Sequence, residues 1–210
     1  MTSPSDAVAS KRLPAEQRRQ QLIDVSLTLF SQRGFNATTM DDIAEAAGVT
    51  KPLLYQHFAS KRALYLELVD SVATTMLEAI GAAAAAAEGP RQQVEAGFAA
   101  YFHLVVTHAE AFTLLFGRDA PNDPELSRAM RHVEDVLAGA IDVLIDAGLD
   151  EDHRRLLAYA VVGMAEGASR LFLTTRSTSG GLPDQAEIDR LSRRVGDLAW
   201  AGLRSVHRDA

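Results

Sequence analysis

Five side chains that can donate a hydrogen bond lie within eleven positions in the N-terminal third of the chain: Lys51, Tyr55, Gln56, His57 and Lys61. Ammonium and hydroxyl groups are donors that proteins use toward phosphate oxygens, and a glutamine amide can pair with the edge of adenine. The alternative is that these residues form an ordinary solvated helix surface. The elements that position them decide between the two.

Short predicted helices surround this cluster. Residues 14–33 have the periodicity of an amphipathic helix, which a glycine then ends. A second helix begins at Thr38 or Thr39, either of which can cap it, and a turn at Gly48 leads to a third helix that Thr50 can cap. Two short helices joined by a glycine-containing turn and braced by an earlier helix predict a helix-turn-helix.

The third helix has one apolar and one polar face. At 100° per residue, Leu54 and Phe58 point the same way, and we expect them to be buried. On the opposite face, Gln56 can pair with adenine, and Pro52 and Leu53 can contact thymine methyl groups. The candidate phosphate donors are Thr39, Thr50, Tyr55, His57 and Lys61.

Residues 14–64 resemble the DNA-binding domain of the tetracycline-repressor (TetR) family of transcriptional regulators. The resemblance is carried by LIDVSLTLFSQRGFNATTMDDIAEAAGVTKPLLYQHFASKRALY, with its RGF ending, its TT..DIA..AGV second helix and its LYQHF.SK..L third helix. It implies phosphate contacts by Thr39, Tyr55 and Lys61, and base contacts by Lys51, Pro52 and Leu53, followed by Gln56. Met40 stands where some members carry a base-reading arginine, so the second helix is not expected to read bases.

The composition is that of a globular chain of 210 residues, 47% hydrophobic and 23% charged. The absence of cysteine excludes a disulfide framework and a thiolate metal site. The net charge of −7 is unevenly divided, because residues 1–62 carry +2 and the remainder −9. This asymmetry indicates a small anion-binding part on an acidic body. Since we find neither a signal peptide nor an apolar run of membrane-spanning length, we expect a cytoplasmic protein without a membrane partner.

Helical periodicity extends through the whole sequence, and no segment shows sustained period-two alternation. We therefore predict an all-α fold with about nine helices. It begins with a disordered arm over residues 1–13, followed by an N-terminal three-helix helix-turn-helix domain over residues 14–60. Residues 61–210 are predicted to form a helical ligand-binding and dimerisation domain.

Aromatic residues gather in the middle of the chain, where they form either a plain core or the lining of an apolar ligand cavity. The family resemblance implies such a cavity within the helices of the body. The expected lining residues, beside the fourth helix, are Phe98, Tyr101, Phe102, Phe112, Phe116 and Met130. Glu166 and Arg170 have the spacing of a helix salt bridge, with ligand recognition as the alternative.

The last two predicted helices repeat apolar residues at alternating intervals of four and three, which is typical of helices in a bundle seam. One seam could serve the chain's own core, but two broad faces, widened by Trp200 and Leu203, predict a four-helix bundle between two subunits. Its residues are Leu157, Val161, Met164, Ala168, Leu171, Ile188, Leu191, Val195 and Leu198. Dimerisation also suits operator binding, because one short helix reads only a few bases.

These features predict a homodimeric, DNA-binding transcriptional regulator, a repressor released from a palindromic double-stranded operator by a small, largely apolar ligand. The alternative is a small-molecule-binding or interaction protein that retains a helix-turn-helix without specific DNA binding. No Ser/His/Asp arrangement, glycine-rich phosphate loop or HExxH motif appears, and His103 and His108 lack the spacing of a metal pair. We therefore expect no catalysis, metal or other cofactor.

Overall fold

The computed structural model describes residues 13–116, 123–145, 148–179 and 184–206. Within these ranges the chain forms nine α-helices and no strand, which confirms the all-α prediction. The helices are α1 (Ala15–Ala37), α2 (Met40–Ala46), α3 (Lys51–His57), α4 (Lys61–Ala85), α5 (Pro90–Thr107), α6 (Ala109–Phe116), α7 (Pro124–Asp142), α8 (Glu151–Ser179) and α9 (Gln185–Leu203).

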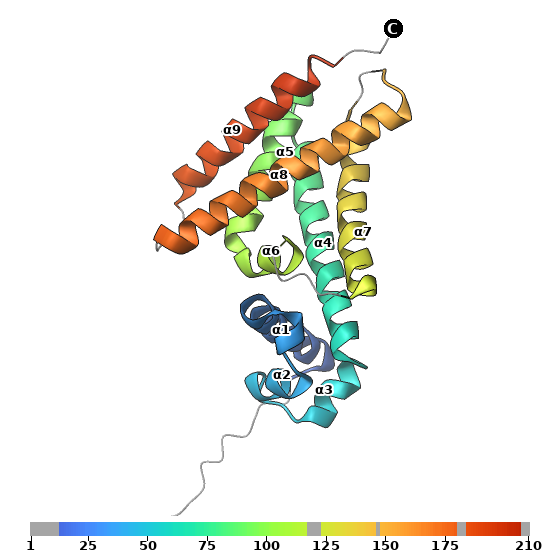
Figure 1. The fold of residues 1–210 in the computed structure, drawn as a ribbon, viewed down its shortest axis with the longest axis vertical. Helices are drawn as coiled ribbons and strands as arrows, with labels where there is room; N and C mark the ends of the chain where they lie inside the picture. Colours follow the sequence, from blue (N-terminus) through green and yellow to red (C-terminus); the bar gives the residue numbers. More distant parts are fainter. Residues whose placement is uncertain (1–12, 117–122, 146–147, 180–183, 207–210) are drawn as a thin grey trace, which may run out of the picture.

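The helices form two parts of unequal size (Figure 1). Helices α1, α2 and α3 form a small unit at one end, and α5 to α9 form the larger body. Helix α4 belongs to both parts, because it contacts α1 and then runs through the body beside α5 and α7. Helices α8 and α9 cross the body obliquely, α8 packed chiefly on α7 and α9 chiefly on α5.

Local side-chain and backbone features set the ends of the short helices. Gly34 has φ 77° and ψ 163°, so helical geometry breaks inside α1 where the sequence predicted a helix end. The Thr39 hydroxyl accepts a hydrogen bond from the Asp42 N–H, and the Asp42 carboxylate accepts one from the Thr39 N–H, which forms a capping box. Ser60 caps α4 as predicted, since its hydroxyl accepts a hydrogen bond from the Ala63 N–H.

Aromatic side chains pack the start of α4 against α1. Tyr65, 2% exposed, lies edge-on against Phe30 and Phe35, with ring centroids 5.3 and 5.0 Å away. Leu54 of α3 and Leu64 of α4 are fully buried in the same core. The small unit of α1, α2 and α3 and the first turns of α4 therefore pack together around one apolar core.

Two sets of polar contacts join this unit to the lower end of the body. Arg62, at the start of α4, forms ion pairs with Asp123 and Glu125 at the start of α7, the latter at 3.1 Å. The Thr28 hydroxyl of α1 donates a hydrogen bond to Glu110 Oε2 of α6 at 2.9 Å. The orientation of the small unit thus depends on where α6 and α7 lie.

Two helices correct the expectation that no apolar run reaches membrane-spanning length. Helix α4 and residues 151–175 of α8 are long and apolar enough to cross a membrane, judged by length and composition alone. In this fold α4 packs against α5 and α7, and α8 packs against α7. Helices inside a soluble bundle can have the same length and composition, so this is a weak indication of a membrane role.

Candidate DNA-binding face and ligand pocket

Helix α3 has the orientation that its periodicity predicted. Leu54 is fully buried and Phe58, at the C-cap, is 3% exposed. The exposed residues of the helix are Lys51, Pro52, Tyr55 and Gln56, whereas Leu53 and His57 are half-buried. The structure therefore brings most of the predicted base- and phosphate-contacting side chains to one accessible face.

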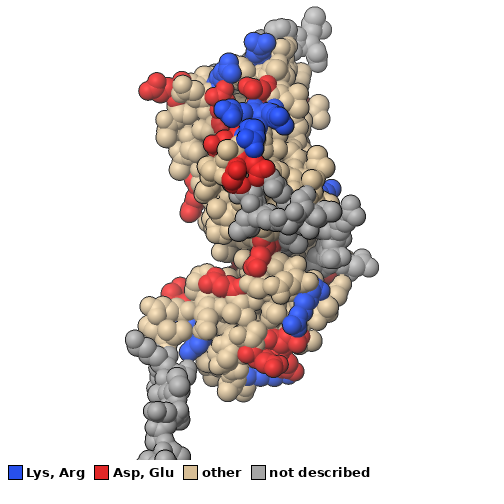
Figure 2. Space-filling model, turned by 90° about the vertical axis from the view of Figure 1, so that its left-hand side faces the viewer, with Lys and Arg blue, Asp and Glu red and all other residues tan. Residues whose placement is uncertain are grey.

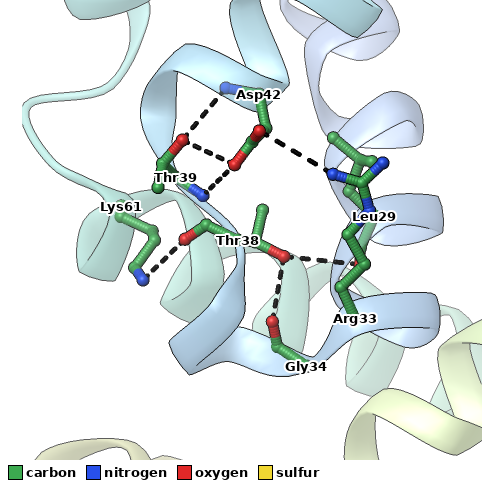
Figure 3. A network of polar contacts seen from close by, with 7 residues as sticks. All are labelled: Leu29, Arg33, Gly34, Thr38, Thr39, Asp42 and Lys61. Carbon is green, nitrogen blue, oxygen red and sulfur yellow. Dashed lines mark hydrogen bonds and ion pairs between the residues drawn. The ribbon is translucent and has the colours of Figure 1, made fainter.

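The two threonines at the helix starts differ in their hydrogen bonds. The Thr39 hydroxyl accepts from the Asp42 N–H at 3.1 Å and donates to Asp42 Oδ2 at 2.6 Å (Figure 3). These bonds from Thr39, helped by the nearby Arg33, lower the pKa of Asp42. Thr50 lies at the N-cap of α3 but makes no side-chain cap hydrogen bond, which corrects the capping prediction. Thr50 is therefore the readier phosphate donor, because Thr39 would first have to leave Asp42.

The two lysines predicted to contact DNA lie in opposite environments. Lys51 is exposed and pairs with Asp41, with Nζ 2.7 Å from Oδ1. Lys61 donates instead to the carbonyl oxygen of Thr38 at 2.7 Å (Figure 3). It also donates to the Phe35 carbonyl oxygen at 2.7 Å, and its Nζ lies 4.3 Å from the Phe35 ring centroid. Burial lowers the pKa of Lys61. Lys61 thus ties the end of α1 to the start of α4, which leaves at most one of its three ammonium hydrogens for a phosphate.

Acidic side chains accompany the basic ones on the small unit. Arg33 Nη1 lies 3.7 Å from Asp42 Oδ1, and Lys51 pairs with Asp41 as described above. On the side of the molecule that Figure 2 shows, basic and acidic atoms are intermixed on the lower lobe and do not form a uniform basic face. Met40 is 7% exposed, in keeping with the expectation that α2 does not read bases. Ion pairs thus offset part of the basic charge of the small unit.

A cavity of about 430 Å³ lies in the body, at the end remote from α1 to α3. It is lined by the last turns of α4, the end of α7 and the residues that follow it, residues 90–101 of α5, the middle of α8 and the end of α9. Its lining is mostly apolar and includes Ile80, Val94, Leu137, Ile141, Val162 and Trp200. The polar or charged side chains on it are Gln93, Tyr101, Glu166 and Arg204. Its size and lining suit a small ligand.

The predicted aromatic set divides between cavity and core. Phe98 and Tyr101 line the cavity. Phe102 is fully buried and stacks on Phe98, and Phe112 packs edge-on against Tyr101, so both belong to the core farther along the bundle. The half-buried Met130 does not line the cavity, and the side chain of Phe116 lies outside the described residues. The prediction erred because Phe102, although it follows the cavity-lining Tyr101 directly, is fully buried in the core, and Phe112 lies on α6, beyond residues 90–101 of α5 that line the cavity.

Residues from the last two helices complete the cavity. Trp200 and Leu203 of α9 line it, together with Val161 and Val162 of α8. The sequence had assigned Val161, Trp200 and Leu203 to apolar faces shared between subunits. Heptad spacing marks an apolar stripe but does not say whether the stripe faces the chain's own interior or a partner.

The predicted interface residues occupy three different environments. Leu171 and Leu198 are 70% and 64% exposed, and Leu156, nearer the start of α8, is 67% exposed. The half-buried members are Leu157, Val161, Met164, Ala168, Leu191 and Val195. Ile188 is 5% exposed within a single chain, because its side of α9 packs into the chain's own core.

Glu166 is the acidic residue on the cavity wall. Its Oε1 is buried and has no hydrogen-bond partner among the described residues, so the expected ion pair with Arg170 is not formed there. Burial, followed by the nearby Glu134 carboxylate, raises the pKa of Glu166 to about 7, while Arg170 acts in the opposite direction. Of the two roles that the sequence left open, the structure therefore disfavours the simple helix salt bridge.

A helix-turn-helix with an exposed third helix, attached to a larger helical body, defines the class of DNA-binding transcriptional regulators. Residues 22–68 match the model of the tetR family of bacterial regulatory proteins. Over 199 residues the chain is 30% identical to the HTH-type transcriptional activator FasR of Mycolicibacterium smegmatis, which covers 93% of this chain and 87% of the relative. The chain therefore belongs to the TetR family, whose members are transcriptional regulators and not enzymes.

Solved structures share this fold over nearly the whole chain. A TetR-like transcriptional regulator from Rhodococcus sp. RHA1 superposes with a TM-score of 0.73 and 26% identity, covering 93% of this chain and 100% of its own. FadR from Bacillus subtilis, solved in complex with stearoyl-CoA, gives a TM-score of 0.71 at 16% identity, covering 87% of this chain and 98% of its own. The FadR comparison concerns the fold alone.

Proposed function

We propose that this TetR-family regulator is a homodimeric repressor that occupies a palindromic DNA operator and is released by a small, largely apolar ligand. The observation that carries the proposal is the accessible face of α3, where Pro52, Tyr55 and Gln56 are exposed while Leu54 is fully buried. Such a face fits a major groove, with Gln56 pairing with adenine and Tyr55 and Thr50 donating to phosphates. Since such a regulator acts on DNA, we infer a cytoplasmic location.

Dimerisation is supported by an unusual apolar surface on the outer helices. Leu156 and Leu171 of α8 and Leu198 of α9 are each more than 60% exposed, and Gly163 and Gly167 are exposed between the two α8 leucines. Leucines at the edges of such a stripe supply apolar area, and glycines let a second backbone approach closely. A two-fold axis would pair the stripe with its own copy and space the two α3 helices by roughly 34–36 Å, one turn of DNA.

Release by a ligand is supported by the connection between cavity and DNA-binding unit. Helix α4 contributes Ile80 to the cavity at one end and Lys61 to the contact with α1 at the other. Helix α7 contributes Leu137 to the cavity and is ion-paired with Arg62 through its first turn. A ligand that moves α4 relative to α7 would change the separation of the two recognition helices. Coupling of this kind typically amounts to about 1–3 kcal/mol.

The apolar character of the proposed effector rests on the lining of the cavity. Leu137, Ile141 and Val162 form its wall with other apolar residues. The similarly folded FadR from Bacillus subtilis was solved with stearoyl-CoA, a ligand with a long apolar chain, and this supports an effector with an apolar part here.

Activation is a second candidate, because the relative that matches 93% of this chain is named an activator. Transcription from the regulated promoter, measured with and without the protein, separates the two: repression predicts more transcript when the protein is absent. The underlying operator binding is tested by retardation of DNA from upstream of the protein's own gene, in excess competitor DNA. Absence of sequence-specific retardation at every upstream fragment would favour a ligand-binding protein without specific DNA binding.

A further inference from the structure

An apolar ligand alone would leave one group on the cavity wall unsatisfied. Glu166, in the middle of α8, has a buried carboxylate oxygen that lacks a hydrogen-bond partner among the described residues. The neighbouring Tyr101 hydroxyl is hydrogen-bonded to Ser169 at 3.3 Å, and Ser169 donates to the Ala165 carbonyl at 2.8 Å. A buried carboxylate oxygen without a donor is destabilising, so a ligand that supplies a donor gains affinity at this position.

The charges around Glu166 favour a cationic donor. Glu134 of α7 repels the Glu166 carboxylate, and burial together with this repulsion raises the pKa of Glu166 to about 7. Arg170 on α8 attracts it, but Arg170 is exposed and forms no ion pair with it in the described part of the chain. Tyr101 of α5 is neutral near pH 7, and burial raises its pKa further. The other charged residue on the wall, Arg204, is exposed at the end of α9.

We propose that the cavity binds a lipophilic amine whose ammonium group donates a hydrogen bond to Glu166. The apolar part of the amine lies against the aliphatic and aromatic wall. Arg204 at the exposed end repels an ammonium group, which orients the ligand with its charged end toward Glu166. This inference rests on the proposed function, because it names the ligand class of the same effector site.

The fluorescence of a tryptophan on the cavity wall can report whether a ligand is bound in the cavity. Its single tryptophan, Trp200, lines the cavity, so a ligand that enters changes the fluorescence of this residue alone. The full-length protein is titrated with decylamine, decanol and decanoate, each below its micelle-forming concentration. We expect decylamine to bind at least about tenfold more tightly than decanol, the ratio corresponding to one charge-assisted hydrogen bond, and decanoate to bind weakest.

Two glutamine variants distinguish the effect of the Glu166 carboxylate on amine binding from the effect of the other charged residue on the wall. Glu166→Gln keeps the size of the side chain but not its charge, and we expect it to reduce the preference for decylamine over decanol to less than about threefold. Arg204→Gln removes the other charge on the wall and should retain the preference for the amine. Operator retardation measured with the same amphiphiles then reports whether binding releases DNA.

A second measurement needs no variant. Because an ammonium group binds the ionised carboxylate, decylamine binding at pH 6 should release a proton from Glu166, as its raised pKa implies. Calorimetric enthalpies in two buffers of different ionisation enthalpy measure that proton. Equal affinity for the amine and the alcohol, or an unchanged preference in Glu166→Gln, would overturn recognition by Glu166 and leave an effector pocket standing. Failure of all three amphiphiles to change Trp200 fluorescence would count against the pocket and hence against both proposals.

Discussion

Replacing Lys61 with methionine is expected to destabilise the DNA-binding unit, because this lysine is engaged inside it. Its ammonium group donates to the carbonyl oxygens of Phe35 and Thr38 at 2.7 Å and lies over the Phe35 ring. Methionine keeps the unbranched apolar stem of the side chain as far as Cε, but it supplies no donor. Two carbonyl groups at the junction of α1 and α4 then lose their partner.

The size of the expected destabilisation follows from the number of hydrogen bonds that Lys61 makes and from their exposure to water. A hydrogen bond to a charged group contributes about 1.5–3 kcal/mol, but Lys61 is only half-buried, so water replaces part of each bond. We expect Lys61→Met to lower the free energy of unfolding by about 2 kcal/mol in total. In a chain of this length, that loss corresponds to a decrease in Tm of roughly 4–8 °C.

Lys51→Met is the matched control, since Lys51 is exposed and, within the described residues, pairs with the exposed Asp41. We expect its Tm to stay within about 2 °C of the wild type, because an exposed ion pair contributes little. Its operator affinity should respond less to salt, because the variant removes one cation from the DNA-contacting face of each subunit; two charges fewer per dimer lower the log–log slope by up to about 1.8. Thermal denaturation and fluorescence anisotropy at several salt concentrations measure both quantities. An unchanged Tm with a reduced salt slope in Lys61→Met would refute the structural role assigned to Lys61.

Three further predictions concern the recognition helix, the subunit contact and the cavity. Gln56→Ala should relax the preference at one base position, at a cost of about 1–3 kcal/mol, whereas Tyr55→Phe should weaken binding to all DNA sites alike. Selection of bound sites from random DNA compares the two variants. An unchanged site profile for Gln56→Ala contradicts base reading by Gln56. Leu198→Glu should yield monomers or aggregates where light scattering finds a wild-type dimer, and a wild-type monomer at micromolar concentration contradicts the dimer. The pKa of Glu166 rises from 4.5 to about 7 on folding, so the native state favours its protonated form and its contribution to stability falls as the pH rises through this window. The Tm of Glu166→Gln should lack that fall. Parallel profiles of Tm against pH for the wild type and the variant would contradict the raised pKa.

Much of the recognition unit could be predicted because its interactions are local. The burial of Leu54 and Phe58 follows from helical periodicity, and the cap by Ser60 follows from a hydroxyl placed before a helical stretch. Gly34 was identified as a helix end for the same reason, since its backbone geometry suits glycine. Not every local prediction holds: Thr50 occupies the predicted N-cap position of α3, but its side chain does not make the capping hydrogen bond.

The sequence by itself therefore determined the helices, the burial of Leu54 and Phe58 and the exposure of Gln56, since periodicity and capping act within a few positions. Only the tertiary structure decided that Lys61 lies against carbonyl groups 23 and 26 positions earlier, instead of pointing outward. It also decided that Trp200 lines a cavity, that Phe102 is core and that Ile188 is buried within its own chain. An apolar stripe specifies that a face is to be buried, but the surface that buries it comes from helices distant in the sequence, and their placement depends on how the whole bundle packs.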